Sequence, residues 1–306
     1  YGDHRDLHLS IRRQRQMCIR DSNKGVGTKA FDLFKNGSWI PVMPDTRLAN
    51  CNLSYSNFLM IPYSNRIENG TFSFENQIYN LAHSELHSIH GDVRNRRWEI
   101  DQKTVESLIC TFNSSHNSAM NWPWDFFAQA SFRLDDFALH MKLSITNNGS
   151  TSMPAGLGWH PYFNRKITSN GEPVLLHFPL DGAYPDANST RIPSGPLAPL
   201  NANQNFNTER ELLHDNHLDL CCHGFNEGSI SWPKSNLRLN ISANDTCQHL
   251  IIYNPPESDY FAIEPVSNAN NGVNLFSQGD HTSGIKVLSP QETLTAICTL
   301  KLEEYE

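Results

Sequence analysis

The chain has 306 residues, of which 38 % are hydrophobic and 18 % charged, and its net charge is −8 at pH 7. This acidic excess argues against binding to the phosphate backbone of a nucleic acid, which requires clustered Lys and Arg. No apolar run approaches the roughly 20 residues of a membrane-spanning helix, so we expect neither a nucleic-acid partner nor a membrane partner. The seven cysteines are scattered and form no C-x-x-C pair, which is typical of a reducing compartment and leads us to expect a cytoplasmic protein.

The N-terminal stretch "YGDHRDLHLSIRRQRQMCIRDS" begins without Met and contains no apolar segment of the kind found in secretory signals. It resembles translated linker sequence, and a basic disordered arm is the alternative. We therefore expect residues 1–24 to be a non-native or disordered arm and residues 25–306 to form a single domain.

Alternation of apolar and polar residues dominates the rest of the chain and predicts β-strands. "TFSFENQIYNL" (71–81) predicts two short strands across a Glu-Asn turn, and further strands are predicted within 137–147, 235–244, 249–255 and 293–302. A Pro-rich stretch at 191–201 predicts a long loop, and no window shows a capped helical stripe. Short strands at regular spacing predict a sandwich or barrel, and the length exceeds the roughly 100 residues of an immunoglobulin-type sandwich. The sequence therefore predicts a large, two-sheet, all-β domain.

The first polar candidates lie in "IPYSNRIENG", where Asn65 and Arg66 follow an apolar run and precede a predicted turn. A guanidinium at a strand end offers five donors in a rigid fork, which suits sugar hydroxyls or a carboxylate. The alternative for Arg66 is an ordinary surface position, since arginine is mostly exposed.

Three histidines follow in "HSELHSIHGDVRNRRW", namely His83, His87 and His90. His90 precedes Gly91, so a tight turn can point the imidazole toward a cleft. A zinc site is an alternative, but the sequence shows neither a fourth ligand nor an H-E-x-x-H frame, and we expect no metal.

The segment "GLGWHPYF" (156–163) places His160 between an apolar run and Pro161. We expect the glycines and Pro161 to shape a bend after a strand, and Trp159, Tyr162 and Phe163 to form part of a sugar-facing wall. A histidine with a pKa near ~6.5 can donate a proton at neutral pH. An aromatic corner of the core is the alternative.

Two carboxylates lie within apolar surroundings. Glu264 lies in "YFAIEPVS", where a carboxylate is costly unless it is paired or used, so it is a candidate general base or one half of a structural ion pair. Asp219 lies in "HLDLCCHGF", and the adjacent Cys221 and Cys222 are expected to be two small buried side chains.

These stretches in this order resemble the aldose 1-epimerase (galactose mutarotase) family from about Phe31 to the C-terminus. The most specific part is "NNGSTSMPAGLGWHPYF", and "PYSNRI", "HG…R…W", "LD…G……WP" and "EPVS…N..N" add independent matches. The resemblance implies a galactose mutarotase-like β-supersandwich, a free sugar as substrate and no cofactor. We expect a monomer or weak homodimer.

The resemblance also implies a role for each candidate. Glu264 matches the base that removes the proton of the C1 hydroxyl, and His160 matches the acid that protonates the ring oxygen. His90 matches the second histidine, which orients the sugar. Positions that bind hydroxyls are matched by Arg66, Asp219 and Asn65.

Some positions depart from the family pattern. Asn268 stands where related members often carry His, and "LDLCCHGF" replaces a more polar form, so we expect an altered sugar preference. "GVGTKAFDLF" only approximates the opening turn of the family, so we expect the first strand to be missing or replaced, with some cost to stability.

Two alternatives to a mutarotase remain. One is a carbohydrate-binding sandwich without turnover, which would not need a matched acid and base. The other is a hexose-6-phosphate 1-epimerase, which would need extra cations at the site. Arg94, Arg96 and Arg97 could supply them, although a surface turn is the expected place for these residues.

Overall fold

The structure is a computed structural model that describes residues 25–35, 37–83, 86–135, 137–168 and 171–305. The arm expected at 1–24 lies outside the described residues. The segment before Gly25, on which the expected loss or replacement of the family's first strand depends, also lies outside them.

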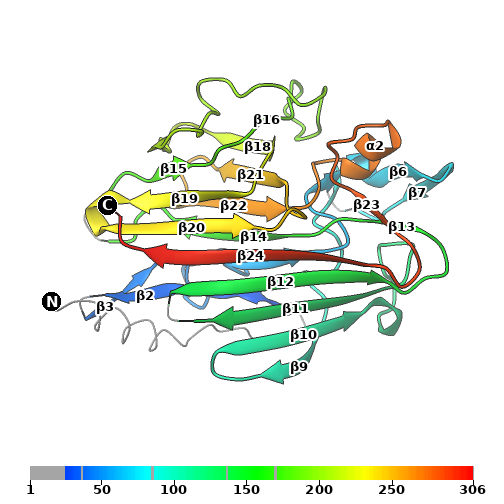
Figure 1. The fold of residues 1–306 in the computed structure, drawn as a ribbon, viewed down its shortest axis with the longest axis horizontal. Coiled ribbons are helices and arrows are strands. Elements are labelled where there is room, and N and C mark those ends of the chain that lie inside the picture. Colours follow the sequence, from blue (N-terminus) through cyan, green and yellow to red (C-terminus); the bar gives the residue numbers. More distant parts are fainter. Residues whose placement is uncertain (1–24, 36, 84–85, 136, 169–170, 306) are drawn as a thin grey trace.

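Most of the described strands form two large antiparallel sheets, stacked one in front of the other (Figure 1). The seven-stranded sheet has the order β1 (Gly27–Thr28), β4 (Asn57–Met60), β14 (Gly158–Asn164), β22 (Tyr260–Val266), β21 (His249–Asn254), β18 (Leu218–His223) and β16 (Gly182–Ala183). The nine-stranded sheet has the order β17 (Arg210–Glu211), β15 (Leu175–His177), β19 (Glu227–Trp232), β20 (Leu237–Ala243), β24 (Thr293–Glu303), β12 (Ala138–Asn147), β11 (Phe126–Leu134), β10 (Ser107–Asn113) and β9 (Glu99–Lys103). The predicted all-β, two-sheet architecture is confirmed.

Smaller elements connect and flank the sheets. Four two-stranded ribbons pair β2 (Asp32–Lys35) with β3 (Ser38–Pro41), β5 (Arg66–Ile67) with β8 (Ser88–Ile89), β6 (Thr71–Phe74) with β7 (Gln77–Asn80), and β13 (Met153–Ala155) with β23 (Lys286–Leu288). The short helices are α2 (Gly272–Ser277) and the 3-10 turns η1 (Glu68–Gly70), η2 (Ser114–His116) and η3 (Pro233–Ser235). The sequence did not predict α2, because six residues are too few to show a helical stripe.

The predicted strands within 71–81 form the hairpin of β6 and β7. Glu75 and Asn76 both have positive φ, 48° and 61°, which is the geometry of a tight two-residue hairpin turn. The strands predicted around 137–147, 235–244, 249–255 and 293–302 correspond to β12, β20, β21 and β24.

Alternation along the strands separates the core from the opposite face of the seven-stranded sheet. On β14, Trp159 and Phe163 are fully buried in the core between the sheets, whereas His160 and Tyr162 lie on the other face. The prediction that Trp159 and Phe163 line a sugar-facing wall is therefore wrong, since neighbouring strand residues point to opposite faces.

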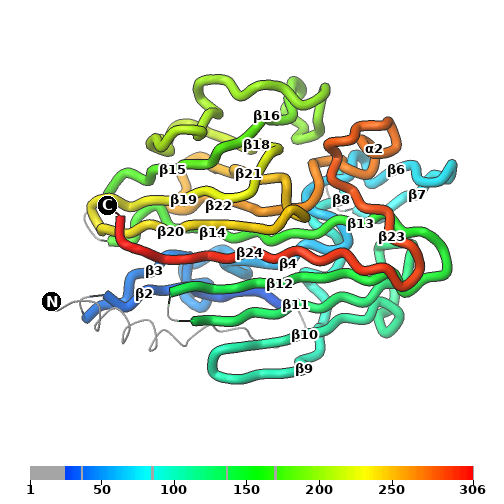
Figure 2. Tube along the Cα trace, in the orientation of Figure 1, coloured from blue at the N-terminus to red at the C-terminus, as the bar shows by residue number. Residues whose placement is uncertain are grey.

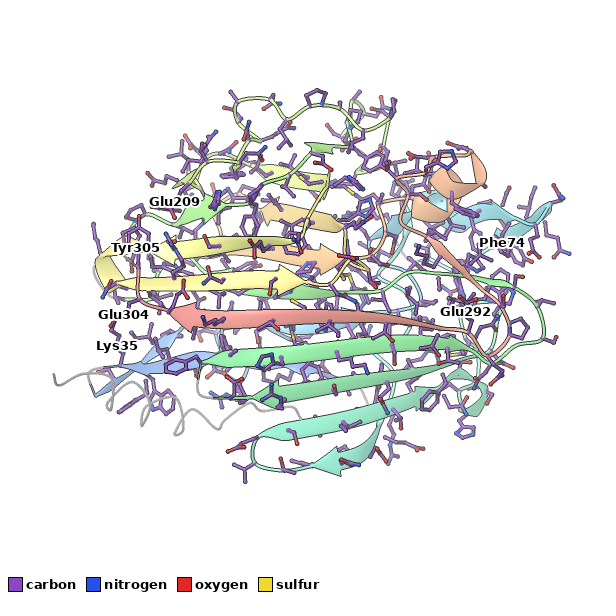
Figure 3. The ribbon with its side chains drawn as sticks, in the orientation of Figure 1. Lys35, Phe74, Glu209, Glu292, Glu304 and Tyr305 are labelled. Atoms are coloured by element: carbon purple, nitrogen blue, oxygen red, sulfur yellow. The ribbon has the colours of Figure 1, made fainter. Side chains whose placement is uncertain are left out.

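The C-terminal segment is held at one end of the sheets by earlier parts of the chain (Figure 2). Lys35 Nζ lies 3.9 Å from a carboxylate oxygen of Glu304, and the Tyr305 hydroxyl donates a 2.9 Å hydrogen bond to Glu209. Figure 3 shows these residues together at that end, far from Phe74 and Glu292 at the other. The last strand is thus held by the β2–β3 ribbon and by the segment before β17.

Candidate active site

The register of two central strands brings His160 opposite Glu264. β14 pairs with β22 at Gly158↔Val266 and again at Tyr162↔Ala262, in one continuous register. Both residues are buried, with side chains 7 % and 2 % exposed, and His160 Nε2 lies 3.1 Å from Glu264 Oε1. An imidazole and a carboxyl group thus face each other on the surface of the sheet that points away from the core.

The ladder between these strands is open beside the pair. No further pairs lie between Gly158↔Val266 and Tyr162↔Ala262, and Pro161 and Pro265, which cannot donate, fall in this interval. The bend predicted at Pro161 is therefore wrong. β14 continues to Asn164, because the N–H that Pro161 lacks falls where β14 makes no hydrogen bond to β22. The amide of the next residue, Tyr162, donates to Ser56 O.

Two aromatic rings hold the imidazole of His160. Phe58, its partner in register on β4, stacks on it with ring centroids 4.5 Å apart, and the Tyr162 ring lies at the same centroid distance from it. The predicted aromatic surroundings are therefore present, but they come from Phe58 and Tyr162.

A tight turn delivers His90 to the same place. His90 and Gly91 both have positive φ, and the His90 amide donates to the Asn65 carbonyl at 2.7 Å. A Cβ on Gly91 would lie 1.9 Å from the Ile61 carbonyl oxygen, so only glycine fits. The His90 ring packs edge-on against His160, with centroids 5.2 Å apart, and burial together with the charge of His160 holds its pKa well below the usual value.

The partly exposed Arg66 and Asp219 and the buried Asn65 lie beside the pair. Arg66 Nη1 donates to Asn65 Oδ1 at 3.0 Å and lies 4.0 Å from Asp219 Oδ2. Arg191, from the predicted long loop, donates through Nε to the same Asp219 oxygen at 3.0 Å. Asn270 Nδ2 donates to the Arg191 carbonyl at 2.8 Å and fixes that loop.

The electrostatics of the central pair follow from burial. Burial raises the pKa of Glu264 well above its usual value, the charge of Asp219 raises it further, and Arg66 opposes this. Burial lowers the pKa of His160 to about 3, and Arg94 and Arg66 lower it further. Burial therefore favours the uncharged form of each group, a protonated Glu264 and a neutral His160.

The buried groups keep unused hydrogen-bonding capacity. Among the described residues, Glu264 Oε2, His160 Nδ1 and His90 Nδ1 have no hydrogen-bond partner. A carboxyl and an imidazole this close together can act as acid and base toward one bound molecule.

All six residues selected from the sequence meet at this site: Glu264, His160, His90, Arg66, Asp219 and Asn65. The sequence did not identify Arg191 or Phe58, whose roles depend on a long loop and on strand register. Arg94 lies on a turn, as expected, and is partly exposed, with its guanidinium carbon 5.6 Å from the Phe58 ring centroid.

The remaining sequence alternatives have plain structural outcomes. His87 Nδ1 accepts a hydrogen bond from the Asn69 amide, and the described residues contain no group of three or more His, Cys, Asp or Glu arranged to hold a metal ion. Cys221 and Cys222 are free and buried, as predicted. No helix in the described ranges is long and apolar enough to cross a membrane.

Asn268 is a structural residue next to the site. Its side chain is buried, accepts from the Ser64 amide at 3.1 Å and donates to the Ser64 carbonyl at 3.3 Å. It thereby fixes the segment that leads into Asn65 and Arg66.

The two stacked antiparallel sheets form a galactose mutarotase-like fold. The structure is similar to a galactose mutarotase-like protein from Clostridium acetobutylicum, with a TM-score of 0.80 and 21 % identity over 92 % of this chain and 91 % of that one. It is also similar to a putative aldose 1-epimerase from Escherichia coli K12, with a TM-score of 0.78 and 19 % identity over 92 % and 94 % of the two chains.

The sequence profile of the aldose 1-epimerase family matches residues 38–301, and the chain belongs to that family. Among curated proteins it is 26 % identical to YihR of Escherichia coli K12 over 73 % of this chain and 74 % of that protein. It is also 26 % identical to a probable aldose 1-epimerase of Arthroderma benhamiae, over 50 % of this chain and 39 % of that protein. An aldose 1-epimerase-type function on carbohydrates follows from this membership.

Proposed function

We propose that this protein is an aldose 1-epimerase that interconverts the α and β anomers of an aldose by acid–base ring opening and closure. The observation that carries the proposal is the buried pair of His160 and Glu264, whose reactive atoms lie 3.1 Å apart and come from adjacent strands. Ring opening of a hemiacetal needs one proton removed and another delivered, and this pair supplies one base and one acid.

In the proposed reaction, Glu264 takes the proton of the C1 hydroxyl while His160 gives a proton to the ring oxygen. The bond between C1 and the ring oxygen breaks, and the C1–oxygen bond becomes a carbonyl. After rotation about C1–C2, the hydroxyl on C5 attacks the other carbonyl face. It returns its proton to His160, and Glu264 protonates the new C1 oxygen. No proton is gained or lost overall.

The favoured form of the pair is not the reactive one. The reaction needs the carboxylate and the imidazolium, which form when the proton of Glu264 moves to His160. A C1 hydroxyl that donates to Glu264 favours the carboxylate, and a ring oxygen that accepts from His160 favours the imidazolium. Bound sugar therefore creates the charge arrangement that it requires.

The remaining site residues hold the sugar. His90 stays neutral and orients the sugar near the ring oxygen, while Asn65, Arg66 and Asp219 bind hydroxyl groups. We keep the expectation of a cytoplasmic enzyme, because the six cysteines within the described ranges are free, as is typical of a reducing compartment.

The proposal is tested by following the optical rotation of fresh α-D-glucose and α-D-galactose with wild type, Glu264→Gln and His160→Asn. Wild type should accelerate mutarotation, and each substitution should lower kcat by roughly 10²–10⁴-fold, the usual contribution of a positioned acid or base. His140→Asn is the matched control, because His140 also lies against a carboxylate, 2.6 Å from Asp135, away from the site.

The competing function is a carbohydrate-binding sandwich without turnover. Sugar that binds in calorimetry while optical rotation changes no faster than in buffer would establish that function and exclude an epimerase for these sugars.

A further inference from the structure

Arg94 is a half-buried cation at the site that the proposed reaction does not use. Its guanidinium lies against the Phe58 ring, with 5.6 Å between the guanidinium carbon and the ring centroid. No carboxylate of the described residues forms an ion pair with it. Asp92, in the same loop, is already engaged by Arg96 at 2.8 Å and by the Asn121 amide at 2.6 Å.

The strand order gives Arg94 a defined place relative to the reacting pair. Glu264 on β22, His160 on β14 and Phe58 on β4 lie on adjacent strands of one sheet and on one face. Neighbouring strands lie about 4.8 Å apart. Arg94 lies over Phe58, and its carbonyl oxygen lies against Gly25, just before β1 on the far side of β4. Arg94 therefore lies beyond His160 on the side away from Glu264.

A pyranose laid along this line presents its atoms in a matching order. If the C1 hydroxyl meets Glu264 and the ring oxygen meets His160, the next ring atom is C5, which carries the exocyclic C6. A substituent on C6 then extends past His160 toward Phe58 and Arg94. The hydroxyls on C2 and C3 extend toward the opposite side, where Asp219 lies.

We propose that the substrate class of this protein is an aldose with an anionic group at C6, which Arg94 binds. The inference rests on the proposed epimerase function and deepens it. A guanidinium binds the paired oxygens of phosphate, sulfate or carboxylate through two parallel hydrogen bonds, whereas a neutral C6 hydroxyl offers a single acceptor.

The charges around the site support an anion at this place. Arg66 and Arg191 both lie near Asp219, at 4.0 and 3.0 Å, so a carboxylate offsets them. Arg94 has no such partner in the described part of the chain, although the whole chain carries a net charge of −8. Arg94 also disfavours the imidazolium of His160, and an anion bound to Arg94 removes this penalty where the acid must be charged.

The experiment compares glucose with glucose 6-phosphate, glucose 6-sulfate and glucuronate, which separate a neutral substrate from three anion types. Anomer exchange is measured by NMR saturation transfer in a phosphate-free buffer, and the uncatalysed rate of each sugar is subtracted. Wild type should act on at least one anionic sugar with kcat/KM at least tenfold above that for glucose. The sugar that is preferred identifies the anion.

Three variants assign that selectivity to Arg94. Arg94→Gln should lower the ratio of anionic to neutral kcat/KM by roughly 10–100-fold, which corresponds to the ~1.5–3 kcal/mol of a hydrogen bond to a charged group. Arg94→Lys, which keeps the charge, should retain part of the ratio. Arg97→Gln, an exposed arginine of the same loop, should leave the ratio unchanged.

The outcomes separate the two proposals. Turnover of glucose at a rate equal to or above that of every anionic sugar overturns the inference about Arg94 and leaves the epimerase intact. An unchanged ratio in a folded Arg94→Gln variant overturns the inference as well. Binding of these sugars without acceleration of any of them overturns the epimerase function itself.

Discussion

Glu264 is a carboxyl group held under conditions that favour its proton. It is 2 % exposed, one of its oxygens has no partner among the described residues, and the nearby charge of Asp219 opposes ionisation. The group therefore destabilises the folded chain at any pH at which the same carboxyl group would be ionised in water. Such a cost is common at sites where a side chain is retained for chemistry.

This predicts that Glu264→Gln stabilises the protein at neutral and alkaline pH. Below the ordinary carboxyl pKa, Glu264 is protonated in both the folded and the unfolded chain, so the substitution changes little. As pH rises, the unfolded chain loses this proton while the raised pKa keeps it in the folded chain, and the stability of wild type falls relative to the variant. The Tm of the variant should exceed that of wild type by several degrees at pH 8, since ~1 kcal/mol corresponds to roughly 2–4 °C.

The difference in Tm should close as pH falls toward 5, which scanning calorimetry across that range measures. A variant that is less stable than wild type at pH 8 would mean that Glu264 is ionised in the folded chain and stabilised by a protonated His160.

At the scale of elements, the site depends on two irregular features of the backbone, an interrupted strand ladder and a tight turn. The β14–β22 ladder opens beside two prolines, and the turn at His90 and Gly91 runs next to Ile61 at the end of β4. Neither feature adds a strand or a helix. Both bring side chains from separate parts of the chain to one place.

The turn predicts a large effect of Gly91→Ala. The new Cβ would lie 1.9 Å from the Ile61 carbonyl oxygen, and the residue must keep a φ of 65°, so we expect a loss of roughly 2–4 kcal/mol in urea unfolding. The KM for sugar should also rise, because His90 is displaced.

Gly279→Ala is the matched control for that substitution. Gly279 also has a positive φ, of 86°, but nothing lies within 4 Å of the position of its Cβ. It should lose only the roughly 1–2 kcal/mol of a left-handed alanine and leave the KM unchanged. Equal losses at both positions would show that the close approach to Ile61 plays no part.

At the scale of the whole molecule, the nine-stranded sheet supports the sheet that carries the site. β24 lies at its centre between β20 and β12, and the alternate residues of β24 form part of the core between the sheets. Leu300 is fully buried there, whereas Ile297 on the opposite face of the same strand is 45 % exposed.

This difference in exposure predicts different losses of unfolding free energy for two substitutions on β24. Leu300→Ala should cost roughly 2–5 kcal/mol, because it leaves a cavity in a packed core. Ile297→Ala should cost less than about 1 kcal/mol, as is usual for partly exposed positions. Urea unfolding measures both, and similar values for the two would contradict the assignment of the core face.

The alternation of side chains was sufficient to predict the class of fold and several strands, because a strand with one buried face repeats every two residues. It failed at "GLGWHPYF", where both faces are covered and Pro161 predicted a bend. β14 runs through Pro161 because its ladder to β22 is interrupted there, and this pairing exists only in the folded chain. The six-residue helix α2 was missed because it is too short for a period to appear.

The sequence by itself determined the residue types of the site and, through the order of its motifs, the resemblance that brought Glu264, His160, His90 and Arg66 together as candidates. Only the tertiary structure decided which other groups join them. Phe58 meets His160 through strand register, Arg191 reaches Asp219 from a long loop, and Arg94 lies over Phe58. Distances between segments far apart in the chain depend on how the strands pair, and that pairing is a property of the folded molecule.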